Sequence, residues 1–198
     1  MNKFSKSLKA LSNTLEILKL PIAKKNVTFY SEGTSYWPHL ENILYQILNK
    51  SDLTVLYLSS DINEPVFKID HPRLRCLYIG QSYIRDFVFQ TINTKIMILT
   101  MPDLNRFSVK RSRFEVHYIY VQHSLVSLHM VYRFGAFDHF DTICCAGPHH
   151  VKEIKAIERE YNLRKKNIIK HGYSRLDFLS KMRGNISRSD INERVLIA

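Results

Sequence analysis

Short apolar runs separated by polar turns set the organisation of this chain. Between residues 26 and 180 these runs alternate with stretches in which apolar side chains recur every three or four positions, as on one face of a helix. The runs that predict strands are residues 26–30, 53–58, 74–79, 95–100, 116–121, 142–146 and 167–170. Helices are predicted over residues 37–49, 83–91 and 151–161. This alternation predicts an α/β fold, a Rossmann-like and mostly parallel sheet with helices on both faces.

The first 25 residues carry a different pattern, that of an amphipathic helix ended by Pro21. The apolar positions that share one face are Phe4, Leu8, Leu11, Leu15 and Leu18. Lysines lie largely on the other faces, and a helix of this kind can lie in a membrane interface. The alternative is that this helix packs on the sheet of this chain or on a missing partner domain.

The end of the chain differs again from the alternating region. Residues 181–193 are polar and typical of a linker, whereas residues 195–198 are apolar, as at the start of a buried strand. We therefore expect three parts: an N-terminal helix in residues 1–25, a sheet domain in residues 26–180, and a linker with the start of a truncated second domain in residues 181–198. The alternative is that residues 195–198 add a short strand to the first sheet.

Composition and charge narrow the classes of function. The hydrophobic share of 45% is that of a globular protein, and no apolar run approaches the roughly 18 residues that span a membrane. Cys76, Cys144 and Cys145 lack metal-ligand spacing, which indicates reduced thiols and a cytoplasmic protein. The net charge of +11 suits an anionic partner. Because zinc-finger and RNA-binding motifs are absent, membrane headgroups or a phosphate-rich substrate fit this charge better than nucleic acid.

Reactive side chains follow the ends of the predicted strands, where ligands bind in an open α/β sheet. His123 follows the fifth strand and can accept a proton from a hydroxyl group near neutral pH, because the ordinary pKa of histidine is about 6.5. Ser31, Glu32 and Gly33 follow the first strand and suit a hydroxylated ligand, or simply form a turn. A loop histidine bonded to backbone is likewise the alternative for His123.

A glycine and an arginine after the last predicted strand are further candidates for binding a ligand. Gly172 permits a close approach of the backbone, and Arg175 can bind a phosphate with two hydrogen bonds or pair locally with Asp177.

His149 and His150 begin a helix without a carboxylate at metal spacing, so no metal site is predicted. Neither a GxGxxG nor a Walker motif is present, and no cofactor is predicted.

Four segments, in their order and spacing, resemble the N-terminal half of the CDP-glycerol glycerophosphotransferase family, which includes teichoic-acid primases and polymerases and related capsule enzymes. The segments are MPDLNRFSVKRS, HYIYVQHSLVSLH, YRFGAFDHFDTICCAGPHHVKEI and HGYSRLD. The resemblance covers residues 95–180 closely and residues 26–94 loosely. It implies a GT-B architecture, in which two Rossmann-like domains face each other across a cleft. The C-terminal domain binds the CDP-linked donor, and the N-terminal domain contacts the acceptor and supplies a histidine as general base.

The resemblance assigns roles to particular residues. His123 takes the position of the general base, and Ser124 stands where many members have glycine. The closing pattern of the family matches Gly172, Tyr173, Arg175 and Asp177. The residues expected to bind substrate are Ser31, Glu32, Gly33, Lys110, Ser124, Gly147, Gly172, Tyr173 and Arg175.

The implied reaction is the transfer of glycerol phosphate. His123 deprotonates an acceptor hydroxyl, which attacks the β-phosphate of CDP-glycerol, and CMP leaves; Lys110, Arg111 or Arg175 neutralises phosphate charge. The implied partners are CDP-glycerol or another CDP-polyol, bound by the missing C-terminal domain, and a phosphate-rich or lipid-linked acceptor at the inner face of the cell membrane. The isolated chain is then expected to be inactive. Two alternatives stay open: half of a GT-B sugar-nucleotide glycosyltransferase, and a non-catalytic fragment that binds glycan or membrane.

Overall fold

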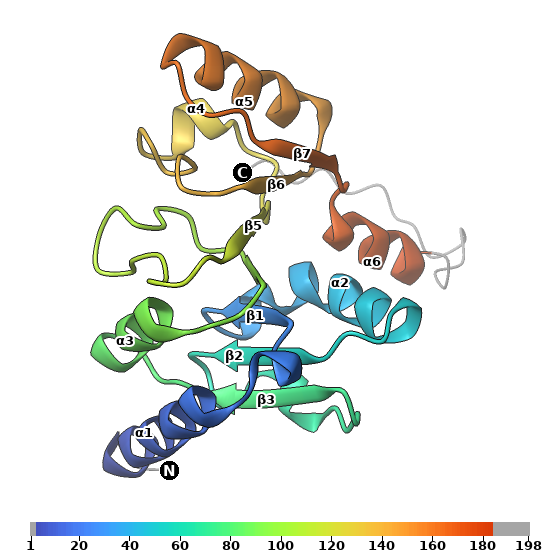
Figure 1. The fold of residues 1–198 in the computed structure, drawn as a ribbon. Coiled ribbons are helices and arrows are strands. Elements are labelled where there is room, and N and C mark those ends of the chain that lie inside the picture. Colours follow the sequence, from blue (N-terminus) through green and yellow to red (C-terminus); the bar gives the residue numbers. More distant parts are fainter. Residues whose placement is uncertain (1–2, 184–198) are drawn as a thin grey trace.

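A seven-stranded, all-parallel sheet forms the centre of the computed structural model, which describes residues 3–183 (Figure 1). The strands are β1 (Val27–Ser31), β2 (Val55–Ser59), β3 (Leu74–Tyr78), β4 (Ile96–Leu99), β5 (His117–Val121), β6 (Thr142–Cys145) and β7 (Asn167–Lys170). Their order across the sheet is β3-β2-β1-β4-β5-β6-β7. The predicted Rossmann-like α/β fold is confirmed, and each predicted strand is part of this sheet.

Helices cover both faces of the sheet. They are α1 (Lys3–Lys19), α2 (Trp37–Lys50), α3 (Tyr83–Thr91), α4 (Leu128–Val131), α5 (Pro148–Glu160) and α6 (Ser174–Arg183). One buried cluster joins side chains of α1, α3 and α5 to one face, and a second joins α2 to the other. Alternate residues of β1 serve the two clusters: Tyr30 meets the ring of Phe89 edge-on at 4.8 Å, whereas Phe29 stacks on Tyr57 at 5.7 Å on the face of α2. The central strands are apolar throughout because they are covered on both sides.

The strand order reverses between β1 and β4, which lie side by side in the sheet. In an open α/β sheet the crevice for a ligand lies outside the carboxyl ends of the strands at such a point. The residues that follow β1, β4 and β5 therefore line the expected position of a site.

Helix α1 packs on the domain through a face that its apolar pattern did not indicate. Ala10, Thr14 and Ile17 are buried, and the amide of Asn13 donates a hydrogen bond of 2.7 Å to the carbonyl of Tyr78. The five predicted apolar positions of α1, Phe4 to Leu18, are instead between 43% and 73% exposed. The helix therefore packs on this chain, as the alternative predicted, but not through the apolar face that the pattern indicated. The small side chains of Ala10 and Thr14 let the helix approach closely, and this decides the orientation.

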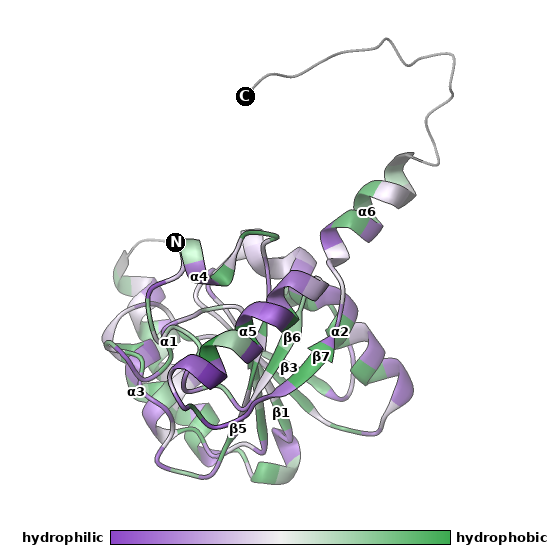
Figure 2. Cartoon of the chain, turned by 90° about the horizontal axis from the view of Figure 1, so that it is seen from above, coloured by the Kyte–Doolittle hydropathy of each residue, from purple (hydrophilic) through white to green (hydrophobic). Residues whose placement is uncertain are grey.

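Helix α6 carries the chain beyond the expected domain boundary at residue 180 and ends at Arg183. Figure 2 shows that α6 points away from the body of the domain, and Leu176, Phe178 and Leu179 are exposed on it. The rest of the expected linker and the expected strand at residues 195–198 lie outside the described residues. Among residues 3–183 no helix is both long enough and apolar enough to cross a membrane.

Candidate functional site

The turn after β1 forms the first wall of the site. Ser31 is fully buried, and its Oγ accepts a hydrogen bond of 3.2 Å from the amide of Gly33 and donates one of 3.1 Å to the carbonyl of the same residue. These bonds fold the backbone at the carboxyl end of the strand, before α2 begins. Gly33 itself is extended, with φ of 161°, so the turn does not depend on a left-handed glycine.

His123 lies directly beyond β5 and is half-buried. The hydroxyl group of Tyr120 lies 3.3 Å from its Nδ1 atom, and a hydrogen bond joins the imidazole to the backbone of Thr100, which follows β4. Burial lowers the pKa of His123, and the bond to Thr100 opposes this shift more weakly. Burial therefore favours the neutral imidazole, the protonation state of a general base, and contacts from two neighbouring strands hold the ring.

Aromatic rings surround His123. Tyr36 meets it edge-on with ring centroids 5.3 Å apart, and His39 and Tyr132 lie at 6.0 Å and 6.5 Å. His39 projects from α2 and is only 4% exposed. Burial, followed by the nearby His123, Arg175 and His171, lowers the pKa of His39 to about 4. Two neutral imidazoles thus lie side by side, and the buried Nδ1 of His39 has no hydrogen-bond partner among the described residues.

Ser124 belongs to a small polar cluster beside His123. Its Oγ lies 3.2 Å from the hydroxyl group of Tyr132, and the amide nitrogen of Gln122 donates to both groups, at 3.2 Å and 3.3 Å. The side chain of Ser124 fills space in this cluster that a glycine at the same position would leave empty. The serine therefore contributes to the order of the loop after β5.

The turn after β7 closes the site from the other side. The hydroxyl group of Tyr173 donates a hydrogen bond of 3.3 Å to the carbonyl of His123, and its ring lies 5.5 Å from that of His39. Gly172 has φ of +83°, which allows the chain to turn from β7 into α6. Arg175 is exposed, and among the described residues it forms no ion pair with Asp177, which leaves its guanidinium group available to a ligand.

Glu32 connects this cluster to a groove of about 810 Å³ beneath α1. Burial raises the pKa of the Glu32 carboxyl group, and the positive charge of Arg85 partly offsets this rise. Across the groove the carboxylate of Asp61 accepts hydrogen bonds of 2.9 Å from the backbone amide of Asn63 and of 2.7 Å from the hydroxyl group of Thr34. These bonds, that from Asn63 most, lower its pKa. The other walls include Lys6, Ser60, Tyr78, Gln81, Ser82 and Tyr83. Carboxylates and hydroxyl groups on the walls suit a hydroxyl-rich ligand.

The structure thus brings most of the predicted site residues together, with two outside the cluster. Lys110 is exposed, and its ammonium group bonds at 3.4 Å to the carbonyl of Asn105 in its own loop. Gly147 precedes α5, whose His149 and His150 bond to the carbonyls of Leu125 and Val126. The two histidines therefore hold the loop that follows Ser124, and Gly147 is near the site only through this loop.

Sequence reasoning missed His39 and the groove. His39 stands in an ordinary helical pattern, and only the packing of α2 beside β5 and the turn after β7 brings it to His123. The groove had a weak signal, since Ser60 and Asp61 follow the second strand as Ser31 and Glu32 follow the first. Polar residues at the carboxyl ends of neighbouring parallel strands lie at the same edge of the sheet, and this is the signal that points to the groove.

No family model, no curated protein and no solved structure matches this chain. Among residues 3–183 no group of three or more histidine, cysteine, aspartate or glutamate side chains is placed to hold a metal ion. Burial raises the pKa of Cys144 to about 12 and that of Cys145 to about 11, so neither is a ready nucleophile. The histidine cluster is therefore the chemical feature of the described residues that best supports a catalytic role.

Proposed function

We propose that this chain is the acceptor-side domain of a CDP-glycerol glycerophosphotransferase-like enzyme of surface-polymer or capsule biosynthesis. The observation that supports it best is a half-buried His123 at the point where the strand order reverses, kept neutral by burial. Tyr120 and Thr100 contact its imidazole, and Tyr173 bonds to its backbone carbonyl. A base in this state and place suits the deprotonation of a hydroxyl group.

In the proposed reaction an acceptor hydroxyl gives its proton to His123, and its oxygen attacks the β-phosphate of CDP-glycerol. The bond from this phosphorus to the bridging oxygen breaks, and CMP leaves with the electron pair. Positioning and charge neutralisation carry most of such a transfer. Arg175, exposed near His39, is the better placed cation, whereas Lys110 is bonded within its own loop.

The donor would be bound by a second, C-terminal domain, and the acceptor would be phosphate-rich or lipid-linked. The net charge of +11 supports a phosphate-rich partner. The groove beneath α1, with Glu32 and Asp61 on its walls, offers polar groups to the polyol part of an acceptor. In this proposal turnover requires that donor-binding domain together with the residues around His123.

The test is CMP release from CDP-glycerol by an enzyme that contains this domain and its donor domain. His123→Gln is expected to lower kcat by about 100-fold or more, the usual contribution of a general base. His129→Gln, an exposed histidine six positions along, is the matched control and should keep full activity. Unchanged turnover in the His123 variant would refute the assignment of the base and favour a non-catalytic module. Transfer from a sugar-nucleotide donor in place of CDP-glycerol would favour the glycosyltransferase.

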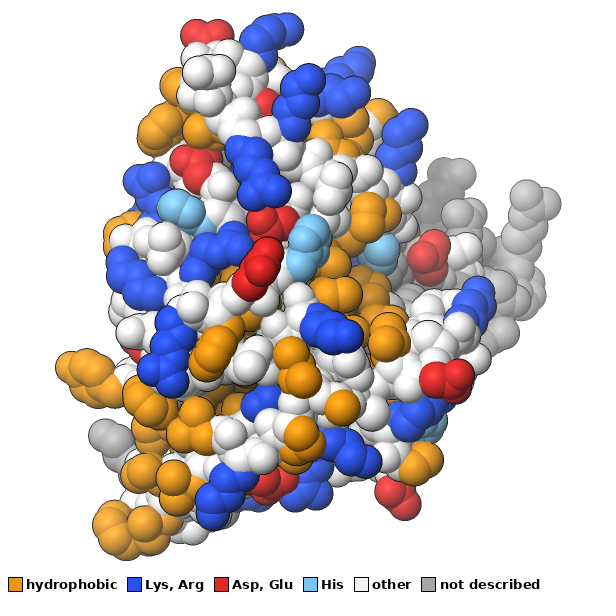
Figure 3. All heavy atoms as spheres, in the orientation of Figure 1, with side chains coloured by type: hydrophobic (Ala, Val, Ile, Leu, Met, Phe, Trp, Pro, Cys, Tyr) orange, Lys and Arg blue, Asp and Glu red, His pale blue; other side chains and the backbone are white. Residues whose placement is uncertain are grey.

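A second proposal concerns location, and it rests on the exposed face of α1. We propose that this face attaches the domain peripherally to an anionic membrane. Leu8, Leu11 and Leu15 are each more than half exposed, and Figure 3 shows hydrophobic side chains gathered at the lower left, over α1 and α3, with lysine and arginine beside them. Apolar burial and attraction to anionic lipids add in such helices.

A further inference from the structure

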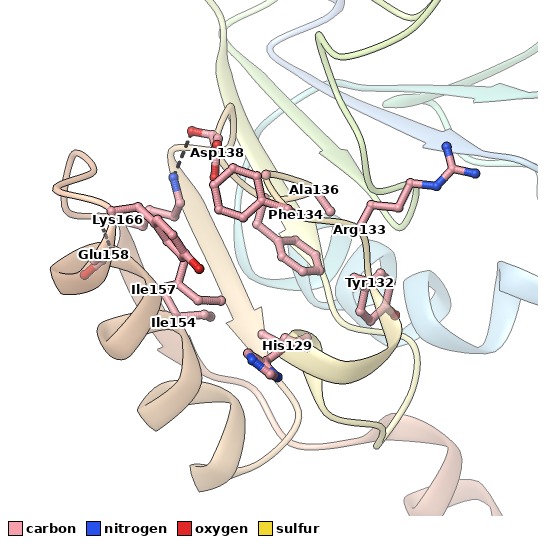
Figure 4. Close-up of a pocket in the computed structure, with 14 residues that line it drawn as sticks. His129, Tyr132, Arg133, Phe134, Ala136, Asp138, Ile154, Ile157, Glu158 and Lys166 are labelled. Atoms are coloured by element: carbon pink, nitrogen blue, oxygen red, sulfur yellow. Dashed lines mark hydrogen bonds between the residues drawn. The ribbon is translucent and has the colours of Figure 1, made fainter.

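A second cavity, of about 200 Å³, lies between α4, the loop at residues 132–138 and α5 (Figure 4). Its floor is apolar and buried, formed by Leu128, Ala136, Phe137 and Ile154. Phe134 and Tyr161 stand on its rim, edge-on to each other with ring centroids 4.6 Å apart. None of the residues proposed above to bind donor or acceptor lines this cavity.

Three charged residues, Lys166, Asp138 and Glu158, lie close together at one end of the cavity, whereas His129 and Arg133 line it elsewhere (Figure 4). The ammonium group of Lys166 donates to the carbonyls of Asp138 and Phe140, at 2.9 Å and 3.2 Å, and the amide of Lys166 donates to Glu158 at 2.7 Å. Two of the three ammonium protons are thereby engaged, and the third remains for a ligand. Because carboxylates lie beside this cation, the cavity does not favour a strongly charged ligand.

Size and wall chemistry define the class of ligand. An engineered apolar cavity of about 150 Å³ is filled by benzene. A cavity of about 200 Å³ therefore holds one ring with a small substituent, and it is too small for a helix of a partner protein. Rings prefer edge-to-face or offset contacts at about 4.5–7 Å, which Tyr132, Phe134 and Phe137 offer from different sides. We propose that this cavity binds the aromatic ring of a small ligand, with a hydroxyl substituent directed at Lys166.

Tyr132 connects this cavity to the histidine cluster. Its ring lines the cavity and meets Phe137 edge-on at 5.0 Å, while its hydroxyl group lies 3.2 Å from Ser124 Oγ and 3.5 Å from the hydroxyl group of Tyr120. Tyr120 in turn contacts Nδ1 of His123. A ring seated in the cavity therefore touches a residue whose other end belongs to the surroundings of His123. This inference does not depend on the reaction proposed above.

The experiment is a titration of the chain with p-cresol, followed by amide and histidine resonances in NMR spectra. We expect saturable shifts at the lining residues and a smaller, saturable shift at the ring protons of His123, with a rise in Tm. Ile157→Trp places an indole in the cavity and should weaken binding at least tenfold. Ile169→Trp, on an exposed position of β7, is the matched control and should bind as the unmodified chain does.

Three results would overturn the inference. They are the absence of saturable shifts in the unmodified chain, equal affinity in the folded Ile157→Trp variant, and the same shifts on addition of glycerol. If the Ile157→Trp variant does not fold, Phe134→Ala is the second test of the site. Phe134 is 61% exposed, so its removal opens the rim of the cavity without disturbing the core. Weaker binding to that variant supports the site, and unchanged binding refutes it.

Discussion

The hydroxyl group of Tyr173 donates a hydrogen bond of 3.3 Å to the backbone carbonyl of His123, although 50 residues separate the two along the chain. This bond ties the end of β5 to the turn between β7 and α6. It restrains the backbone that carries the candidate base without engaging the imidazole itself.

Replacing Tyr173 with phenylalanine should therefore loosen the His123 loop while keeping the packing on His39. We expect a loss of about 1 kcal/mol in the free energy of unfolding, the usual net contribution of one hydrogen bond. Urea denaturation gives this value, and NMR line widths at His123 report the loop. Tyr45→Phe, at an exposed tyrosine of α2, is the control and should change neither. A stable variant with an unaltered His123 spectrum would show that the bond restrains nothing.

Buried His39 makes stability depend on pH. Its pKa is about 4 in the folded protein and about 6.5 when unfolded, so between these values only the unfolded chain binds the proton. Stability should fall as the pH falls from 6.5 towards 4, with a contribution from this group approaching about 1.4 kcal/mol per pH unit. His39→Phe should flatten the dependence, and His129→Gln, an exposed histidine, should leave it intact. An equally steep dependence in His39→Phe would assign the effect to other groups.

The pH profile of turnover tests the state of His123. Because burial lowers the pKa of this imidazole, kcat/KM should rise with pH through an apparent pKa below 6.5 and then level off. The measurement requires the enzyme with its donor domain and CDP-glycerol. An acid limb that persists unchanged in His123→Gln would assign the titration to another group.

Co-sedimentation with vesicles tests the exposed face of α1. Leu11→Ser combined with Leu15→Ser should abolish binding to vesicles rich in phosphatidylglycerol, whereas added salt should weaken binding of the unmodified chain. The free energy of unfolding should change by less than about 0.5 kcal/mol per substitution, because both side chains are exposed. Leu53→Ser, at another exposed leucine, is the control. Binding that survives the double substitution would refute this attachment, and self-association that the double substitution removes would identify a second copy as the partner.

Two glycines of the site should respond differently to alanine. Gly172 has φ of +83° and open space around it, so Gly172→Ala adds only backbone strain of about 1 kcal/mol. Gly33 is extended, and a Cβ there would meet Asp61 at an ordinary 3.5 Å, so Gly33→Ala should leave stability unchanged. Denaturation curves of the two variants give the comparison. Equal losses would mean that the turn after β1 is more constrained than its φ indicates.

The strands could be predicted because burial on both faces requires near-continuous apolar runs, and β1 and β2 are buried throughout. The positions of Ser31 and His123 followed from the same logic, since the carboxyl ends of parallel strands share one edge. The orientation of α1 could not be predicted in this way. Periodicity indicates which face is apolar, whereas the contact surface was decided by the small residues Ala10 and Thr14.

The remainder of the site depends on tertiary packing. His39 contacts His123 and Tyr173 only because α2 packs beside the end of β5 and the start of α6, where Ser174 Oγ also donates a hydrogen bond of 2.9 Å to the carbonyl of Pro38. No local pattern marks a helical histidine for such a place. The isolation of Lys110 likewise follows from the course of a long loop that no periodicity describes.

The place of β1 between β2 and β4 also governs how the chain can assemble during synthesis. Once Tyr78 has emerged from the ribosome, β1, β2 and β3 can pair, but the other edge of β1 stays open until β4 arrives, with Tyr30 opposite Leu99. An unpaired strand edge is a template for wrong association. Each later strand then adds to the outer edge in the order of its translation, so the second half of the sheet can grow at the pace of the ribosome.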